Sequence, residues 1–136
     1  MTSKGRDEHL PWWLLAPIAG IGGLAASAAF MPFNAWPLAF VAVAVLAWAT
    51  SRAASVAAAA AVGWSFGLLF MFTSLIWQTS IMIASYAGLS VLMSLFYAAL
   101  GAVLHLTGRR RLAPLWGAGA WTLVEFTTSV FPFDGF

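Results

Sequence analysis

The sequence predicts an all-α protein, a polytopic bundle of about five transmembrane helices with its N-terminus in the cytoplasm. Hydrophobic residues make up 62% of the 136 positions and charged residues only 7%, whereas soluble domains contain roughly 25% charged residues. Six basic and four acidic side chains are too few to cover a water-soluble domain of this length. The apolar residues also form long runs, which short polar or proline-containing segments separate. Lipid is therefore the expected surroundings of most of the chain.

The first two helices are predicted on either side of a proline-containing turn. A cytoplasmic tail at residues 1–11 precedes an apolar run at 12–30, which is long enough to cross a bilayer core of about 30 Å. A cleavable signal peptide is the alternative for this region, because basic residues, an apolar stretch and small residues follow one another there. Two prolines and an asparagine after residue 30 favour a tight hairpin. The second run, at 37–50, is shorter than the roughly 20 residues of a full crossing and is the weakest predicted helix.

Three further helices are predicted from apolar runs at 56–77, 89–106 and 113–131. A single arginine separates the second run from the third, and a mildly polar connection at 78–88 separates the third from the fourth. Three arginines at 109–111 end the fourth run, and Pro114 suits the first turn of the fifth helix. The transmembrane region is thus expected to span residues 12–131, and residues 132–136 to begin a periplasmic segment.

The distribution of charge predicts the orientation in the membrane. If all five runs cross, the six basic residues fall on one side, which the positive-inside rule places in the cytoplasm. The basic residues form no stripe interleaved with aromatic residues, so nucleic acid is not an expected partner. The arginines at 109–111 are instead expected to meet anionic lipid headgroups.

Glu125 is the one acidic residue within a predicted membrane helix, and it lies in the outer half of that helix. A carboxyl group in hydrocarbon is costly and normally faces the interior of a bundle or a wet cavity. Two interpretations stay open from the sequence. Glu125 is either a functional residue or a structural glutamate that is hydrogen-bonded near Trp121 or Thr128.

Small residues four positions apart predict close packing of helices. Gly63 and Gly67 form one such pair, and Gly23 with Ser27 forms another. Two helices approach closely where no bulky side chain separates them, and membrane proteins often use this pattern. A ligand groove is the alternative interpretation of the same small residues.

Several kinds of chemistry are excluded by the residue types. The chain has no cysteine and two histidines, so neither a metal site nor a cysteine nucleophile is expected. His105 lies near the cytoplasmic end of the fourth predicted helix and Asp134 beyond the opposite end of the fifth, which excludes a Ser-His-Asp triad. His105 is expected to be an interfacial residue. No glycine-rich phosphate-binding motif is present, and no cofactor is expected.

Four short stretches, in this order along the chain, carry a resemblance to a known family. They are MPFNAWP at residues 31–37, GWSFG at 63–67 followed by Trp77, WTLVEF at 121–126, and FPFDGF at 131–136. Together with the predicted topology, they make the whole chain resemble the N-terminal transmembrane region of bacterial apolipoprotein N-acyltransferase. The last stretch resembles the front of that family's Gly-Phe-Pro-Trp element.

The resemblance implies a multi-pass enzyme of the bacterial inner membrane. Such a transferase moves an acyl chain from a membrane phospholipid, the donor, to the N-terminal diacylglyceryl-cysteine of a diacylated lipoprotein, the acceptor. The family's chemistry belongs to a nitrilase-like domain with a glutamate, a lysine and a cysteine. This chain contains no cysteine, so it is expected to be truncated before that domain and to be inactive alone.

The resemblance also implies which residues support substrate binding near the outer face. The candidates are Glu125, Trp77, Phe131, Pro132, Phe133, Gly135 and Phe136. The alternative function is a membrane scaffold for a polyprenol-phosphate mannose synthase, with a glycosyltransferase as the partner. A small transporter or channel fits less well, because no pair of intramembrane ionisable groups and no interrupted repeat is present.

Overall fold

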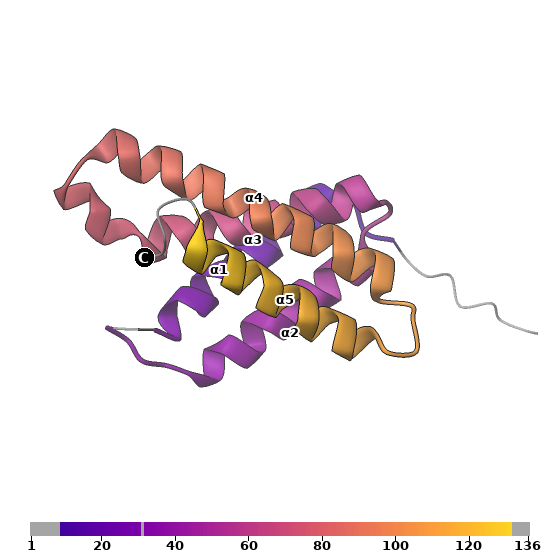
Figure 1. The fold of residues 1–136 in the computed structure, drawn as a ribbon. Coiled ribbons are helices and arrows are strands. Elements are labelled where there is room, and N and C mark those ends of the chain that lie inside the picture. Colours follow the sequence, from indigo (N-terminus) through magenta and orange to yellow (C-terminus); the bar gives the residue numbers. More distant parts are fainter. Residues whose placement is uncertain (1–8, 31, 132–136) are drawn as a thin grey trace, which may run out of the picture.

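The computed structural model describes residues 9–30 and 32–131, and every regular element in these two ranges is a helix. The helices, in chain order, are α1 (Trp12–Ala28), α2 (Pro37–Arg52), α3 (Val56–Ser74), the short 3₁₀ helix η1 (Ile76–Ser80), α4 (Ile83–Thr107) and α5 (Ala113–Val130). The five α-helices pack side by side as one bundle (Figure 1). The predicted all-α bundle is thereby confirmed.

The first three helices end near, but not at, their predicted limits. α1 was expected to reach residue 30 and ends at Ala28, because the chain turns into the hairpin there. Asn34 in this hairpin has a φ of 51°, a left-handed conformation that asparagine tolerates better than most residues. α2 extends to Arg52 instead of residue 50. The run predicted as one helix over 56–77 is divided into α3 and η1.

The largest difference from the predicted limits is at the start of α4. The helix was expected to begin at residue 89 and begins at Ile83, so most of the predicted connection at 78–88 is helical. Tyr86 lies in the first turn of α4, and its hydroxyl donates a hydrogen bond to the carbonyl oxygen of Phe72 at 2.5 Å. This bond joins the start of α4 to the end of α3. Tyr86, the polar residue that suggested a loop, is therefore hydrogen-bonded to the neighbouring helix.

α3 lies at the centre of the bundle, antiparallel to α4. A Cβ atom on Gly63 would collide with the carbonyl oxygen of Tyr97 and would lie 3.0 Å from Cα of Gly101. The indole Nε1 of Trp64 also donates a hydrogen bond to Oγ of Ser94 at 2.8 Å. The two backbones touch only because both helices carry glycine where they cross, so the prediction that Gly63 serves helix packing is confirmed.

On its other side, α3 packs parallel to α1. The hydroxyl of Ser65 donates to the carbonyl oxygen of Ala16 at 2.7 Å, and the hydroxyl of Ser27 donates to that of Phe70 at 3.1 Å. A Cβ atom on Gly23 would collide with the backbone of α3, so this glycine allows the close approach. Hydrogen bonds between helices stabilise such contacts in lipid, where water does not compete for the polar groups.

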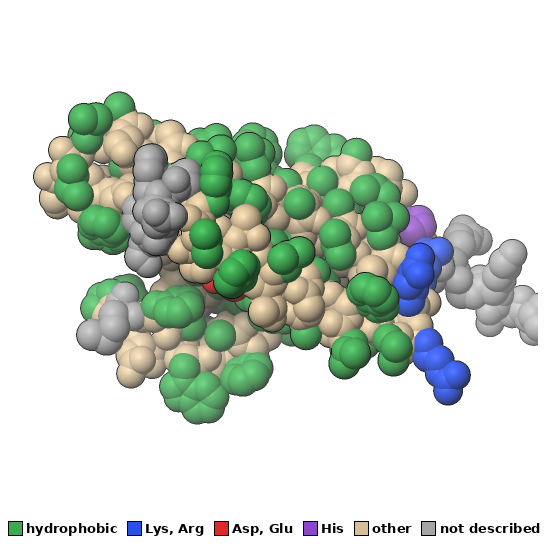
Figure 2. Space-filling model, in the orientation of Figure 1, with side chains coloured by type: hydrophobic (Ala, Val, Ile, Leu, Met, Phe, Trp, Pro, Cys, Tyr) green, Lys and Arg blue, Asp and Glu red, His purple; other side chains and the backbone are tan. Residues whose placement is uncertain are grey.

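The outer surface of the bundle is largely apolar, while the described basic side chains gather at one end (Figure 2). Large exposed hydrophobic side chains occur on every α-helix and on η1. α3 and α4 are long and apolar enough to cross a membrane, whereas α1 and α2 are shorter apolar helices. A surface of this kind fits a hydrocarbon solvent, because a soluble monomer seldom exposes large continuous apolar areas.

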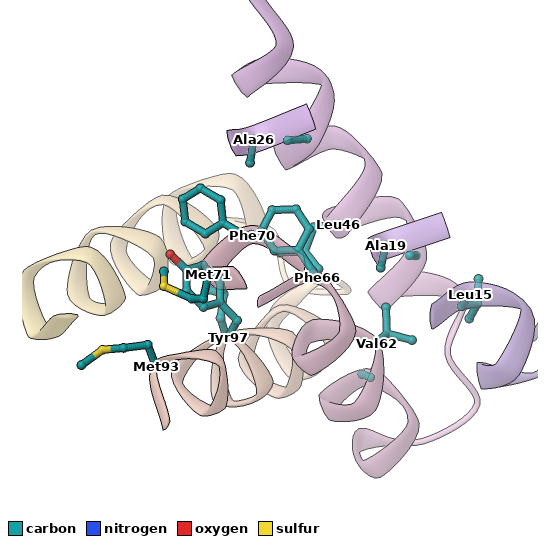
Figure 3. Close-up of a cluster of buried hydrophobic side chains, with 14 of the residues drawn as sticks. Leu15, Ala19, Ala26, Leu46, Val62, Phe66, Phe70, Met71, Met93 and Tyr97 are labelled. Atoms are coloured by element: carbon teal, nitrogen blue, oxygen red, sulfur yellow. The ribbon is translucent and has the colours of Figure 1, made fainter. Parts of the chain in front are cut away.

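α5 is attached to the bundle on one side only. It packs against α4, and within the described residues its backbone makes no close approach to α2. No residue of α5 is fully buried, although Trp121 and Val124 pack against the core. The core itself contains Phe66, Phe70 and Tyr97 (Figure 3). A space therefore remains between α2 and α5, and this space holds the candidate site.

Candidate functional site

Glu125 on α5 is hydrogen-bonded to a tyrosine in the core of the bundle. The hydroxyl of Tyr97, on α4, donates to Oε1 of Glu125 at 2.8 Å. Tyr97 is 0% exposed, so the phenol cannot turn to another solvent-facing partner. A buried tyrosine hydroxyl normally needs a hydrogen-bond partner, and Glu125 supplies it. The bond also fixes one oxygen of the carboxylate in place.

Aromatic rings hold the phenol of Tyr97 in this orientation. The ring centroid of Tyr97 lies 5.6 Å from that of Phe70, 5.9 Å from that of Phe66 and 6.0 Å from that of Trp121. The contacts with Phe70 and Trp121 are edge-to-face, an arrangement that aromatic quadrupoles favour. Helices α3, α4 and α5 all contribute to this cluster. The position of the Glu125 carboxylate is thus set by three helices.

The carboxylate of Glu125 faces a small cavity of about 260 Å³. The other lining residues are all apolar and come from α1, α2, α3, α5 and the turn after α1; they are Ala26, Phe30, Ala39, Ala42, Val43, Phe70 and Trp121. Figure 2 shows acidic colour within a hollow of this face of the molecule. The cavity therefore combines an apolar wall, which suits an alkyl chain, with one hydrogen-bond acceptor, which suits a hydroxyl or amine donor.

A second and larger cavity, of about 450 Å³, continues the first one along the bundle. It lies between α2, α4 and α5, and Val43 and Trp121 line both cavities. The two spaces are therefore neighbours along the α2 and α5 side of the bundle, and we call them together the α2–α5 cleft. We call the first cavity, which Glu125 lines, the outer cavity, because it is the one farther from the end of the bundle that carries the arginines; the second cavity extends toward that end.

The residues predicted from the family resemblance are not all brought together. Phe131 follows α5 and places its ring 6.3 Å from that of Phe96 on α4. Trp77 lies in η1, is 52% exposed and lines neither cavity of the cleft. Pro132, Phe133, Gly135 and Phe136 lie outside the described residues. Of the three candidates that the structure describes, Glu125 lines the cleft, and Trp77 and Phe131 do not.

The sequence interpretation missed Tyr97, the partner of Glu125. It expected a structural glutamate to bond near Trp121 or Thr128, and both residues are indeed close. Thr128 donates its hydroxyl hydrogen bond to the backbone carbonyl of Glu125 rather than to the carboxylate, at 3.0 Å. The signal available in the sequence was a tyrosine in the middle of an apolar helix, since its hydroxyl needs a partner in lipid.

His105 lies far along the bundle from Glu125, at the end that carries the arginines. Its Nδ1 lies 2.9 Å from the carbonyl oxygen of Thr50, so it joins α4 to α2. Within residues 9–30 and 32–131, no group of three or more His, Cys, Asp or Glu side chains is placed to hold a metal ion. The arrangement around Glu125, one carboxyl group in an apolar lining, is suited to binding an amphiphile.

These features define a helical membrane protein with an apolar cleft that contains a single carboxylate. The family is identified by comparison: the chain belongs to the apolipoprotein N-acyltransferase N-terminal domain family, whose model matches residues 22–136. It is also similar to the apolipoprotein N-acyltransferase of Rhodopseudomonas palustris (strain ATCC BAA-98 / CGA009), with 38% identity over 74 residues. That match covers 50% of this chain and 14% of the curated relative's length. No solved structure matches the chain.

Proposed function

We propose that this chain is the membrane part of an N-acyltransferase that moves a fatty acyl chain from a phospholipid to the N-terminal diacylglyceryl-cysteine of bacterial lipoproteins. The observation that carries the proposal is the family match over residues 22–136. The named function of the Rhodopseudomonas palustris relative supports it. The apolar α2–α5 cleft supports it as well, because both substrates carry long acyl chains.

The protein would be a multi-pass protein of the bacterial inner membrane, with the arginine end in the cytoplasm. Arg52 and the arginines at 109–111 are exposed at one end of the bundle, and His105 lies at the same end. At the other end, η1 exposes large apolar side chains, Ile76 and Trp77. The positive-inside rule supports a cytoplasmic position for the arginines, which leaves η1 on the periplasmic side.

The chemical step would depend on residues outside this sequence. Acyl transfer through a thioester needs a cysteine nucleophile, and none of the 136 residues is cysteine. We therefore expect the 136-residue chain to be inactive alone. Its own contribution would be to hold acyl chains, with Glu125 and the outer cavity as the contact site and with Trp77, Phe131 and residues 132–136 as supporting residues near the outer face.

Complementation tests this function directly. The full-length protein that carries this chain is expressed in bacteria depleted of their own apolipoprotein N-acyltransferase, and mass spectrometry measures the N-terminal lipopeptide of a major lipoprotein. We expect triacylated lipopeptide with the full-length protein and only diacylated lipopeptide with the 136-residue chain. Diacylated lipopeptide in both cases, with the full-length protein present in the membrane, would refute the acyltransferase.

The same strains test the mannose synthase scaffold, which stays a prediction from the sequence. A scaffold would change the level of mannosyl phosphopolyprenol and would co-purify with a glycosyltransferase, while lipoprotein acylation would stay unchanged. The two functions are thus distinguished by two products that are measured in one set of membranes.

A further inference from the structure

The second cavity of the α2–α5 cleft lies next to the arginine end of the bundle. We call it the inner groove. Its apolar walls come from three helices and include Val43, Leu46, Ala47, Leu104, Pro114 and Trp121. α4 contacts both α2 and α5 and forms the floor of the groove. Within the described residues, α2 and α5 make no close backbone approach to each other, so no helix–helix contact closes the groove. Its shape and lining suit a flexible alkyl chain more than a polar molecule.

Four exposed arginines follow residues that line the inner groove, and we call this end of the groove its cationic rim. Ser51 and Gly108 line the groove, and Arg52 and the arginines at 109–111 follow them directly in the chain. All four of these arginines are exposed, and Figure 2 shows basic side chains at this end. The hydroxyl of Ser51 is bonded to the carbonyl oxygen of Trp48 in its own helix at 2.7 Å. The guanidinium of Arg52 lies 5.7 Å from the ring centroid of Trp48 in its own helix, and the side chain keeps N–H groups exposed for a ligand.

Within the described part of the chain, no acidic side chain lines the inner groove. Glu125 is the only Asp or Glu in residues 9–30 and 32–131, and it lines the other cavity. A ligand with an alkyl chain and an anionic head matches both parts of the site, the apolar groove and the cationic rim. Guanidinium groups bind phosphate oxygens with particularly favourable geometry.

We propose that the inner groove binds one anionic phospholipid from the leaflet on the arginine side, with an acyl chain between α2 and α5 and its phosphate at Arg52 and Arg110. This lipid would be a structural ligand that fills the cleft, distinct from an acyl donor approaching from the other side of the membrane. The inference rests on the membrane orientation proposed above but not on acyl transfer. Its test therefore measures lipid retention rather than activity.

The test is native mass spectrometry of the full-length protein that carries this chain. The protein is released from a mild detergent after addition of phosphatidylglycerol or of phosphatidylcholine with identical acyl chains. We expect one phosphatidylglycerol molecule to be retained preferentially, by about fivefold for each arginine that contacts the headgroup. The double variant Arg52→Gln with Arg110→Gln should remove this preference and lower retention of phosphatidylcholine less, because the choline of that lipid already offsets the charge of its phosphate.

A bulky substitution tests the groove separately from the rim. Ala47 lines the groove on α2 and is exposed, so Ala47→Phe should fill the groove and abolish retention of the single phosphatidylglycerol. Ala44→Phe is the matched control, because Ala44 is exposed on the same helix and does not line the groove. Ala118→Phe, on the opposite wall, repeats the test if Ala47→Phe lowers the melting temperature.

Two results would overturn the proposal. Equal retention of the two phospholipids by the unaltered protein would show that the rim does not select an anionic head. Unchanged retention in both groove-filling variants would show that the lipid binds elsewhere and that a protein helix or another occupant fills the groove. Absence of acyl transfer with normal lipid retention would contradict the function proposed above and leave the lipid site supported.

Discussion

Glu125 and Tyr97 form the side-chain hydrogen bond that joins α5 to α4, at 2.8 Å. Replacement of Tyr97 by phenylalanine leaves the carboxylate without this donor in an apolar cavity. We expect Tyr97→Phe to lower the free energy of unfolding of the full-length protein by about 0.5 to 1.5 kcal/mol, as for other hydrogen bonds of this kind. Unfolding in a series of detergent mixtures measures the change. An unaltered stability would mean that the bond contributes nothing to the fold.

Glu125→Gln tests the functional role of the carboxylate itself. The glutamine amide oxygen still accepts the hydrogen bond from Tyr97, so stability should change less than activity. We expect lipoprotein N-acylation by the full-length protein to fall severalfold, as measured by the ratio of triacylated to diacylated lipopeptide. Thr122→Val is the matched control, since Thr122 lies on α5, bonds to Ala118 in its own helix and lines neither cavity. Unchanged acylation at an unchanged protein level would remove Glu125 from the candidates.

A third prediction at this scale concerns Gly63. A Cβ atom at this position would collide with the backbone of α4, whereas a Cβ atom on Gly88 would meet nothing within 4 Å. We expect Gly63→Ala to cost about 1 to 3 kcal/mol of stability, since α3 and α4 must separate. Gly88→Ala should be neutral or slightly stabilising, because alanine favours the helix over glycine. Equal melting temperatures for the two variants would contradict the close packing.

The sequence identified some of these residues but not their partners. The spacing of Gly63 and Gly67 favoured a packing face over a ligand groove, because small residues at this spacing let membrane helices approach closely. Glu125 was conspicuous because it is a charge within an apolar run. Tyr97 was missed, since the choice of partner depends on the rotation and register of α4 against α5. Those quantities are set by packing in three dimensions and leave no periodic signal in one helix.

At the scale of helices, the positions of the elements were predicted better than their limits. A helix was found at each of the five apolar runs, because each run buries apolar side chains against its neighbours. The start of α4 was misplaced because Tyr86 and nearby small or polar residues interrupt the apolar run. The helix forms there nonetheless, since the Tyr86 hydroxyl is satisfied by α3. Tertiary contacts thus decided the boundary.

The one-sided attachment of α5 leads to a prediction about cross-links. A Cβ atom on Gly117 would lie 3.2 Å from Cδ2 of Leu104, so cysteines at these two positions should be joined by a short bis-thiosulfonate reagent, which forms reducible links and spans more than the Cβ–Cβ distance of a direct disulfide. Cysteines at Ala47 and Ala118, on opposite walls of the α2–α5 cleft, should not. The chain has no cysteine of its own, so each pair is unique within it. Gel mobility with and without a reductant measures both pairs.

Efficient cross-linking of Ala47→Cys with Ala118→Cys would contradict an open cleft between α2 and α5. A low yield of the Ala47–Ala118 cross-link would be explained by a bound acyl chain, which should slow the approach of α2 and α5. Removal of phospholipid with a harsher detergent should then raise the yield of the Ala47–Ala118 cross-link. The yield of the Leu104–Gly117 cross-link should stay the same and serves as the internal control.

At the scale of the whole molecule, charge and apolar surface divide the bundle into two ends and a middle. Arginines and His105 occupy one end, and η1 with its exposed apolar residues occupies the other. The α2–α5 cleft connects the two regions, with a carboxylate in the outer cavity and a cationic rim at the inner groove. Such an arrangement suits a protein that meets lipids in both leaflets and keeps the two contact sites apart.

The orientation predicted for the whole protein is testable with single cysteines in this cysteine-free chain. Ser80→Cys places an exposed thiol at the end of η1, and Arg111→Cys places one after α4 at the opposite end. The positive-inside rule places the arginines in the cytoplasm and the end of η1 outside. An impermeant maleimide added to spheroplasts should therefore label Ser80→Cys and not Arg111→Cys. After lysis both should react, which controls for burial of the thiol. Labelling of Arg111→Cys in intact spheroplasts would reverse the orientation, and the anionic lipid of the inner groove would then belong to the outer leaflet.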